Sequence, residues 1–209
     1  MAISLWDKFK KHVNDNIILY ISISIVLLLG IVCGSLGVKM LENNEEQDLI
    51  NLIDSFCTTF PSSEVQSGFL LKKCLIANFK ILSLIWFLGL TVIGAPLILI
   101  VVGIKGFYLG FTAGFLIQEK GLLGILFTTL ALMPQNIFNM PALMIAGVLA
   151  ISFSFWLLKR HVREGRIQLW RHFISYTLCL SVLALLFTIG SFIEAYFTPM
   201  LIKLVIAYL

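Results

Sequence analysis

Charged residues are scarce in this chain of 209 residues, of which they make up only 12%. A soluble globular domain carries about twice that share of charge and is close to half apolar, whereas this chain is 59% hydrophobic. A water-soluble fold of this size cannot bury so much apolar surface. The scarcity of charge therefore excludes a soluble domain and indicates that a bilayer is the solvent for most side chains.

Recognisable catalytic and cofactor motifs are also missing. The chain has no HExxH, no GxSxG, no Walker-type phosphate loop and no GxGxxG pattern. Its histidines, His12, His161 and His172, lie in basic stretches and are far in sequence from any paired carboxylates. We therefore expect that the protein is not an enzyme and binds no cofactor. The net charge of +4 suits orientation in a membrane better than nucleic-acid binding.

The cysteines offer no metal-binding pattern, because none lies in a CxxC or in a Cys/His cluster. Cys33 and Cys179 fall in apolar runs and are expected to be small core residues. Cys57 and Cys74 share one polar stretch, so they either pair on an oxidising side of the membrane or remain free thiols. We expect no metal site.

Long apolar runs are what the chain has instead. The first, 17–37, is long enough to cross the ~30 Å hydrocarbon core of a bilayer. It exceeds the apolar core of a signal peptide, so we expect an uncleaved anchor. The runs predict an all-α fold, a polytopic integral membrane helical bundle with five transmembrane spans and a re-entrant or broken segment. We expect one transmembrane domain, 1–209, with spans at 17–37, 75–102, 104–118, 139–158 and 173–193.

Basic residues at the ends of these runs predict the orientation of the bundle. Residues 159–171 are rich in Lys and Arg, with Glu164 as their only acidic residue, and should form a cytoplasmic loop. Residues 1–16 mix lysines with aromatic residues and are expected to form an interfacial segment on the cytoplasmic face. The acidic stretch 38–74 suits an extracytoplasmic loop. The N-terminus is therefore expected in the cytoplasm, and the C-terminus, from Glu194 onward, outside.

The predicted outer loop contains an amphipathic helix at about residues 46–60. Its apolar side chains recur at helical spacing, and polar side chains occupy the opposite face. The apolar stripe must be buried against the bilayer, the protein's own spans or a partner, and these three alternatives stay open. The candidate partner-docking residues are Leu49, Leu52, Ile53, Phe56 and Phe60.

Two stretches that contain proline predict irregular structure inside the bundle. Pro96 lacks a backbone donor and is expected to kink the second span. Residues 121–138 are expected to be either a half-helix that re-enters from outside or a surface turn between two short helices. The amides Gln135, Asn136 and Asn139 then either line a polar cleft or bond the broken backbone and neighbouring helices.

Glycines spaced four residues apart predict close contacts between helices. They are Gly30 and Gly34 in the first span, and Gly106, Gly110 and Gly114 in the third. The groove in the third span allows another helix backbone to approach, either within the chain or in a second copy. A homo-oligomer therefore stays open.

Two ionisable residues, Lys105 and Glu194, fall inside apolar stretches, where charge is costly and often functional. Both lie near the ends of predicted spans. Lys105 is therefore expected to reach the inner headgroups and Glu194 the outer ones, with a functional role as the alternative.

Four sequence blocks, in this order along the chain, resemble the stage II sporulation protein M family of endospore-forming bacteria. The blocks are residues 91–96, 105–115, 133–136 and 193–199. Ala95 and Met133 stand where a leucine is common in that family, which is a mild departure. The resemblance covers the whole chain, including its length and the loop after the first span.

The resemblance implies a role in thinning the septal peptidoglycan and in engulfment of the forespore by the mother cell. It implies a non-catalytic membrane scaffold whose protein partners are stage II sporulation proteins D and P, which cut peptidoglycan. Membrane lipid is the other implied partner. The expected location is the bacterial cell membrane, at the sporulation septum and in the engulfing mother-cell membrane. The alternative is a small membrane transporter or flippase that uses a polar cleft at Gln135–Asn139.

Overall fold

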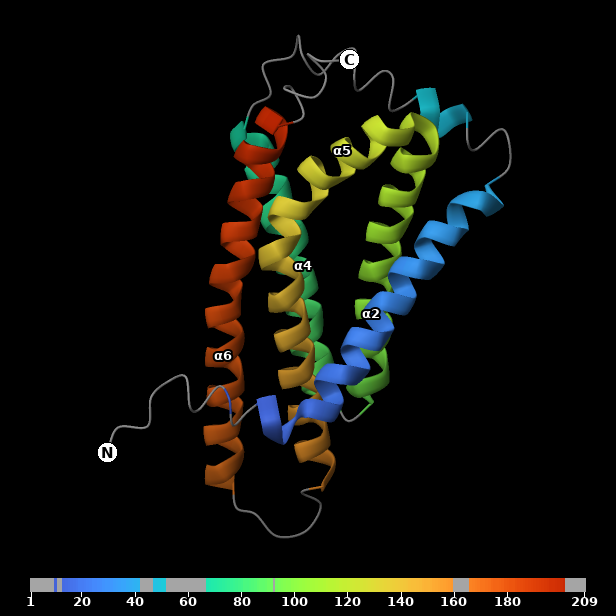
Figure 1. The fold of residues 1–209 in the computed structure, drawn as a ribbon. Helices are drawn as coiled ribbons and strands as arrows, with labels where there is room; N and C mark the ends of the chain where they lie inside the picture. Colours follow the sequence, from blue (N-terminus) through green and yellow to red (C-terminus); the bar gives the residue numbers. More distant parts are fainter. Residues whose placement is uncertain are drawn as a thin grey trace.

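The described part of the chain is a bundle of long helices without a strand. The computed structural model describes residue 10 and residues 13–41, 47–51, 67–91, 93–159 and 166–201. Its elements are α2 (Ile17–Gly37), the 3-10 turn η1 (Val38–Met40), α4 (Ser67–Gly89), α5 (Gly94–Lys159), α6 (Arg166–Phe192) and the π-helical segment η2 (Ile193–Phe197). Figure 1 shows that the long helices run between the same two ends of the bundle.

Gly121 divides α5 into two arms, because its φ of 56° and ψ of −126° are not helical. Glycine adopts this conformation without the steric penalty of a Cβ. The first arm, 94–120, rises from the turn after α4, as Figure 1 shows. The second arm, 122–159, crosses the upper end of the bundle and then descends between the first arm and α6. One long helix in sequence is therefore two antiparallel segments in space.

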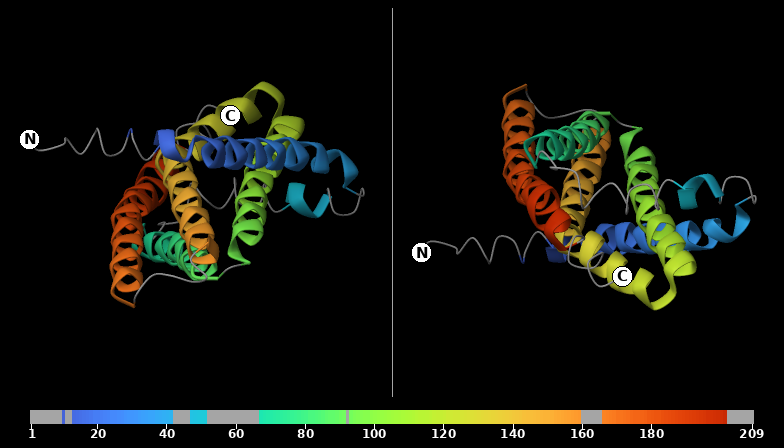
Figure 2. Two further views of the ribbon diagram at one scale, coloured as in Figure 1. Left: turned by 90° about the horizontal axis from the view of Figure 1, so that it is seen from below. Right: turned by 90° about the horizontal axis from the view of Figure 1, so that it is seen from above.

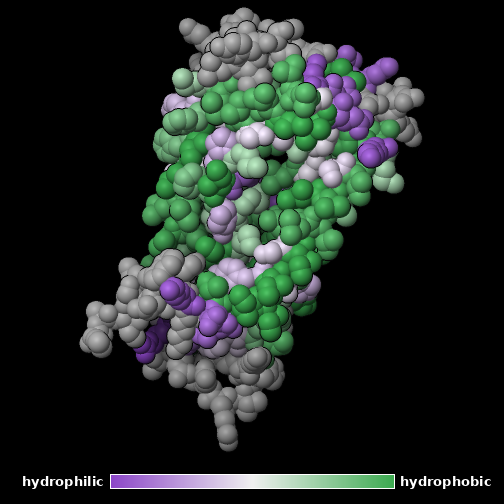
Figure 3. Space-filling model, viewed as in Figure 1, coloured by the Kyte–Doolittle hydropathy of each residue, from purple (hydrophilic) through white to green (hydrophobic). Residues whose placement is uncertain are grey.

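The outer surface of the bundle is apolar along most of its length (Figure 3). On α2, Ile18 is 75% exposed, and Leu28 is 60% exposed. Exposed apolar surface on this scale suits contact with lipid rather than water. Within the described chain, three helical stretches are long and apolar enough to cross a membrane: Ile17–Met40, Gly94–Leu158 and Leu169–Leu201. The second of them includes both arms of α5.

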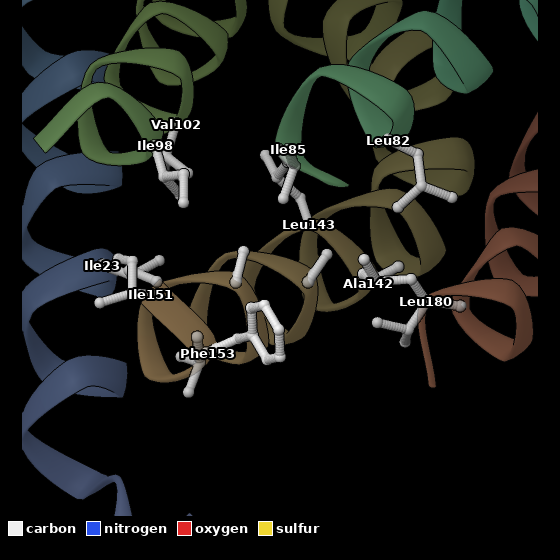
Figure 4. Close-up of a cluster of buried hydrophobic side chains, with 14 of the residues drawn as sticks. Ile23, Leu82, Ile85, Ile98, Val102, Ala142, Leu143, Ile151, Phe153 and Leu180 are labelled. Atoms are coloured by element: carbon white, nitrogen blue, oxygen red, sulfur yellow. The ribbon is translucent and has the colours of Figure 1, made fainter. Parts of the chain in front are cut away.

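The core lies where all four long helices approach one another in the lower part of the bundle. Figure 4 shows apolar side chains from α2, α4, both arms of α5 and α6 converging there. Its largest fully buried members include Ile23, Ile85, Ile98, Val102 and Ile151. Their interlocking fixes the relative positions of the helices, because the interior of a protein is packed as closely as an organic crystal.

Glycines allow α2 to lie directly against the first arm of α5. A Cβ on Gly30 would meet the Phe107 nitrogen at 3.1 Å, and one on Gly34 would meet the Phe111 nitrogen at 2.8 Å. The structure thus places the predicted packing glycines of α2 within the chain, against the backbone of α5. Across the interface, Gly106, Gly110 and Gly114 face residues of α2 in the same way. Figure 2 shows α2 lying across this arm, on the side away from α4.

Hydrogen bonds between helices fasten the lower end of the bundle. The Tyr176 hydroxyl on α6 donates to the Ile85 and Trp86 carbonyls near the end of α4, at 3.3 and 3.2 Å. The Ser154 hydroxyl donates to the Thr91 carbonyl in the turn between α4 and α5, at 2.8 Å. These bonds tie α6 and the second arm of α5 to the end of α4 and to the turn that follows it.

The turn between the second and third predicted spans lies earlier in the sequence than predicted. The structure ends α4 at Gly89 and begins α5 at Gly94, so the chain reverses at residues 90–93 rather than near residue 103. Pro96 therefore causes no kink and lies in the first turn of α5, where the missing N–H has no helical partner to lose. The short third span predicted at 104–118 is part of the longer first arm.

Three further predictions differ from the structure. The break predicted within residues 121–138 lies at Gly121, its first residue, whereas the rest of the stretch stays helical through Pro134. The helix predicted to end at residue 193 continues through η2, so Glu194 does not begin an external tail. Cys33 and Cys179 are exposed on the bundle surface rather than buried as core residues.

Candidate functional site: a polar cavity among α4, α5 and α6

A cavity of about 180 Å³ lies between α4, both arms of α5 and the end of α6. Its polar lining consists of Cys74 and Asn78 from α4, Lys105, Tyr108 and Thr112 from the first arm, Gln135, Asn136 and Asn139 from the second, and Glu194 from η2. Figure 3 shows a hollow in the hydrophobic surface of the bundle with hydrophilic side chains inside it. Polar groups are therefore gathered in the interior of a molecule whose exterior is apolar.

The two charged residues reach the cavity because both lie inside helices rather than at their ends. Lys105 is near the middle of the first arm, since α5 begins at Gly94 and the arm continues to residue 120. Glu194 lies in the π-helical turn η2. Such turns are rare, and many of them occur at functional sites. The predicted separation of these charges to opposite membrane faces is wrong, because both side chains line one cavity.

The Glu194 carboxylate is held by a donor from the second arm of α5. With its amide nitrogen turned toward Glu194, Gln135 donates to the two carboxylate oxygens at 3.0 and 3.2 Å. Cys74 on α4 lines the same cavity and interacts electrostatically with this carboxylate. Hydrogen bonds to a charged acceptor are stronger than those between neutral groups. Glu194 therefore links η2 to the second arm of α5 and lies in one cavity with α4.

Lys105 faces the same cavity without a direct bond to Glu194. The two charges are close enough to interact electrostatically. Among the described residues, however, the Lys105 ammonium has neither an ion-pair partner nor a hydrogen-bond acceptor. A buried ammonium carries three N–H donors that need acceptors. The cavity therefore has unused donor capacity at Lys105.

The three amides have different surroundings. Asn136 donates to the Leu132 carbonyl one turn earlier in its own helix, at 2.7 Å. Asn139 is only 8% exposed, and its Oδ1 accepts no hydrogen bond from the described part of the chain. It packs against Gly190 on α6, where a Cβ would collide with it. Of the three amides, only Asn136 therefore donates to a backbone carbonyl, whereas Gln135 donates to the Glu194 carboxylate in the cavity.

The cavity becomes apolar toward the lower part of the bundle. Ile81, Met140, Leu143 and Phe187 line it on the side nearer to the core. Leu143 and Phe187 also belong to the buried apolar cluster of that core. Packed apolar side chains without polar partners exclude water. The cavity is therefore a pocket with an apolar floor rather than a continuous polar channel through the bundle.

Several cavity residues were not singled out from the sequence. Asn78 is buried and donates to the Ser191 hydroxyl at 2.9 Å, which connects α4 to α6. Cys74 and Asn78 are four residues apart, and Tyr108 and Thr112 follow Lys105 at helical spacing. Polar residues that recur on one face of an apolar helix indicate a face turned toward a polar interior. The helical spacing of these polar residues in α4 and in the first arm was therefore the signal in the sequence that could have identified the cavity.

Most of the predicted docking surface lies outside the described residues. Residues 47–51 are helical, and Leu49 among them is half-buried. Leu52, Ile53, Phe56 and Phe60 are outside the described ranges, as is Cys57. Of the two alternatives for Cys57 and Cys74, the structure gives Cys74 a free thiol.

Three of the four sequence blocks that carry the family resemblance meet at the cavity. Lys105, Gln135 and Glu194 each come from a different block, and the structure brings them to one place. No curated protein and no solved structure matches the chain. The family model for Stage II sporulation protein M matches it over residues 23–199, which include every described helix that lines the cavity. The chain therefore belongs to the Stage II sporulation protein M family.

Proposed function

We propose that this sporulation-related membrane protein is a non-catalytic scaffold for the complex that remodels septal peptidoglycan during engulfment. The family match over residues 23–199 carries the proposal, because it covers the membrane bundle together with the acidic loop after α2. The proposed partners are stage II sporulation proteins D and P.

We further propose that α2, α4, the two arms of α5 and α6 are the five spans. Each of them runs between the two ends of the bundle in Figure 1. Near the proposed cytoplasmic end, aromatic rings pack together, as in the contacts of Trp156 with His172 and of Trp86 with Phe173. Aromatic residues favour the membrane interface, and basic loops favour the cytoplasm. Residues 159–171 would therefore be inaccessible to an impermeant reagent added to intact cells.

The scaffold proposal is tested through the acidic loop. Replacing Leu52, Ile53 and Phe56 by serine should leave the protein in the membrane but abolish co-purification of the two hydrolases. The matched control changes Asn51 and Asp54, on the polar side of the same predicted helix, to serine. If the triple variant recovers the hydrolases as well as the wild type does, Leu52, Ile53 and Phe56 are not the docking surface.

A second candidate function, transport or lipid flipping, is favoured by the cavity itself. A small membrane protein that moves polar molecules needs a polar site within the bundle, and Gln135 lies there against a charged residue. Proteoliposomes should then show uptake of labelled glycine or flipping of a fluorescent phosphatidylethanolamine. Gln135→Leu combined with Asn136→Leu should abolish that activity. Wild-type vesicles that are inactive with both probes would leave this candidate without support.

A further inference from the structure

We propose that the cavity binds a small zwitterion, with the anionic group of the ligand on Lys105 and its cationic group on Glu194. The inference rests on the cavity that favours the second candidate function, but it requires only binding, not transport. It concerns one occupant that carries a negative and a positive charge a few bonds apart.

The charge balance of the cavity favours such an occupant. Lys105 and Glu194 are the only charged side chains among the described residues that line the cavity, so its net charge is zero. A simple anion would approach Lys105 but would add an uncompensated charge near Glu194, and a simple cation would do the reverse. Uncompensated charge is costly in a low-dielectric interior. A zwitterion places each of its charges beside the opposite one and keeps the cavity neutral.

The hydrogen-bonding groups are also arranged for a dipolar ligand. Within the described chain, the Lys105 ammonium has no acceptor and can donate to a carboxylate or phosphate. Glu194 already accepts from Gln135, which holds its carboxylate in position. A carboxylate has about four acceptor sites, so Glu194 retains capacity for an ammonium group. The ligand would thus complete the contacts of two groups that the protein holds apart.

The volume of the cavity limits the size of the ligand. Its 180 Å³ corresponds to about six water molecules. That space admits an amino acid or a phosphoethanolamine group but not a drug-sized molecule. The same charge pattern occurs in a free amino acid and in the headgroup of phosphatidylethanolamine. The shared chemistry is therefore an ammonium group joined by a short link to a carboxylate or phosphate.

Cys74 provides a reporter inside the proposed site, because it lines the cavity and interacts electrostatically with Glu194. The full chain carrying Cys33→Ser, Cys57→Ser and Cys179→Ser leaves this cysteine as the only target for a water-soluble methanethiosulfonate. The protein is reconstituted in phosphatidylcholine nanodiscs, and the labelling rate is measured with and without glycine or O-phosphoethanolamine. We expect either zwitterion to slow labelling about tenfold at saturation. An equimolar mixture of acetate and ethylammonium, which carries the same charges on separate molecules, should slow it far less.

A second reporter and two variants connect the result to the proposed groups. Thr112→Cys in a background with Cys74→Ser and the other cysteines replaced places a thiol on the opposite wall of the cavity. The double variant Lys105→Met with Glu194→Gln keeps the cavity neutral and should lose protection while both reporters still react. Lys80→Met removes an exposed lysine of α4 outside this cavity and should keep protection. Size-exclusion chromatography checks that each variant remains folded.

A further arm identifies the source of the ligand. Nanodiscs containing phosphatidylethanolamine should protect Cys74 without added solute if a lipid headgroup occupies the site, whereas protection by glycine alone indicates a soluble zwitterion. The inference is overturned if neither reporter reacts in the folded protein although both react after denaturation. It is also overturned if the reporters react but no zwitterion protects them, or if the double variant keeps protection. A zwitterion can protect the reporters from labelling even if the protein shows no transport and recovers no hydrolase. Failure of either candidate function is therefore distinguishable from failure of the binding inference.

Discussion

Replacing Gly110 with alanine should separate α2 from the first arm of α5. A Cβ at this position would lie 2.7 Å from the Cα and carbonyl carbon of Ile31, which are backbone atoms that no side-chain rotation can move away. An ordinary contact of a Cβ begins at 3.4 Å, and the Ile31 carbonyl oxygen would be closer still, so the two backbones must move apart by more than about 0.7 Å. The same shift would be imposed along the neighbouring turns, because both elements are continuous helices.

The cost follows from the loss of close packing. A gap of about 0.5–1 Å removes roughly a quarter to a half of the dispersion attraction between facing atoms. Overpacking of a well-filled interface typically costs about 1–3 kcal/mol. For a chain of this length, each kcal/mol corresponds to about 2–4 °C in the unfolding midpoint. We therefore expect Gly110→Ala to lower the midpoint by several degrees.

The measurement is thermal unfolding in detergent, followed by size-exclusion chromatography of the heated protein. Gly103→Ala is the matched control, since it lies in the same arm, but its Cβ would meet only the Val26 side chain, at 3.4 Å. Alanine favours helix more than glycine does by about 1 kcal/mol, so the control should be neutral or slightly stabilised. Equal midpoints for the two variants would refute the close α2–α5 contact. Dissociation of an oligomer by Gly110→Ala with an unchanged midpoint would instead place this groove between copies of the chain.

Three further predictions use the same unfolding assay. Gly121→Ala should be destabilising by about 1–3 kcal/mol because of its backbone conformation alone, since a Cβ there would meet no atom within 4 Å; a neutral result would contradict the break between the arms. Lys105→Met alone should lower the unfolding midpoint by leaving Glu194 uncompensated, whereas adding Glu194→Gln should recover most of that loss; additive losses would contradict the charge interaction. Gly190→Ala should be destabilising, and Asn139→Ala should relieve part of the loss by removing the side chain that the new Cβ meets; an equal loss in both backgrounds would argue against this contact.

The sequence was sufficient to predict the class of fold, because composition decides whether lipid or water surrounds the chain. It was less informative about the turn at residues 90–93. In a lipid-exposed helix every face is apolar, so hydropathy does not fall where the chain reverses. Gly94 and Pro96 are compatible with a kink as well as with a helix start. The structure shows a helix start, and in the turn before it the Thr91 carbonyl accepts a hydrogen bond from Ser154 on the second arm.

The misplaced turn also explains why the cavity was only partly predicted. With a turn near residue 103, Lys105 falls at a membrane surface, where a lysine needs no partner. With the turn at residues 90–93, the same lysine lies well inside the first arm. Glu194 was misplaced for a related reason, since the π-helical continuation of α6 has no clear signature in sequence. The amide of Gln135 was recognised as out of place in lipid, but its acidic partner was not.

The cavity bears on how far a purely passive scaffold can describe this protein. A buried pair of opposite charges can often be exchanged for apolar side chains of similar volume without loss of stability. A bundle that only anchored an outer loop would gain nothing from Lys105, Gln135 and Glu194 in its interior. Their convergence around one polar cavity is readily understood if the bundle responds to an occupant. Because Glu194 is bonded to the second arm and lies in one cavity with α4, an occupant that binds there would change the forces between these helices, of which α4 follows the acidic loop in sequence.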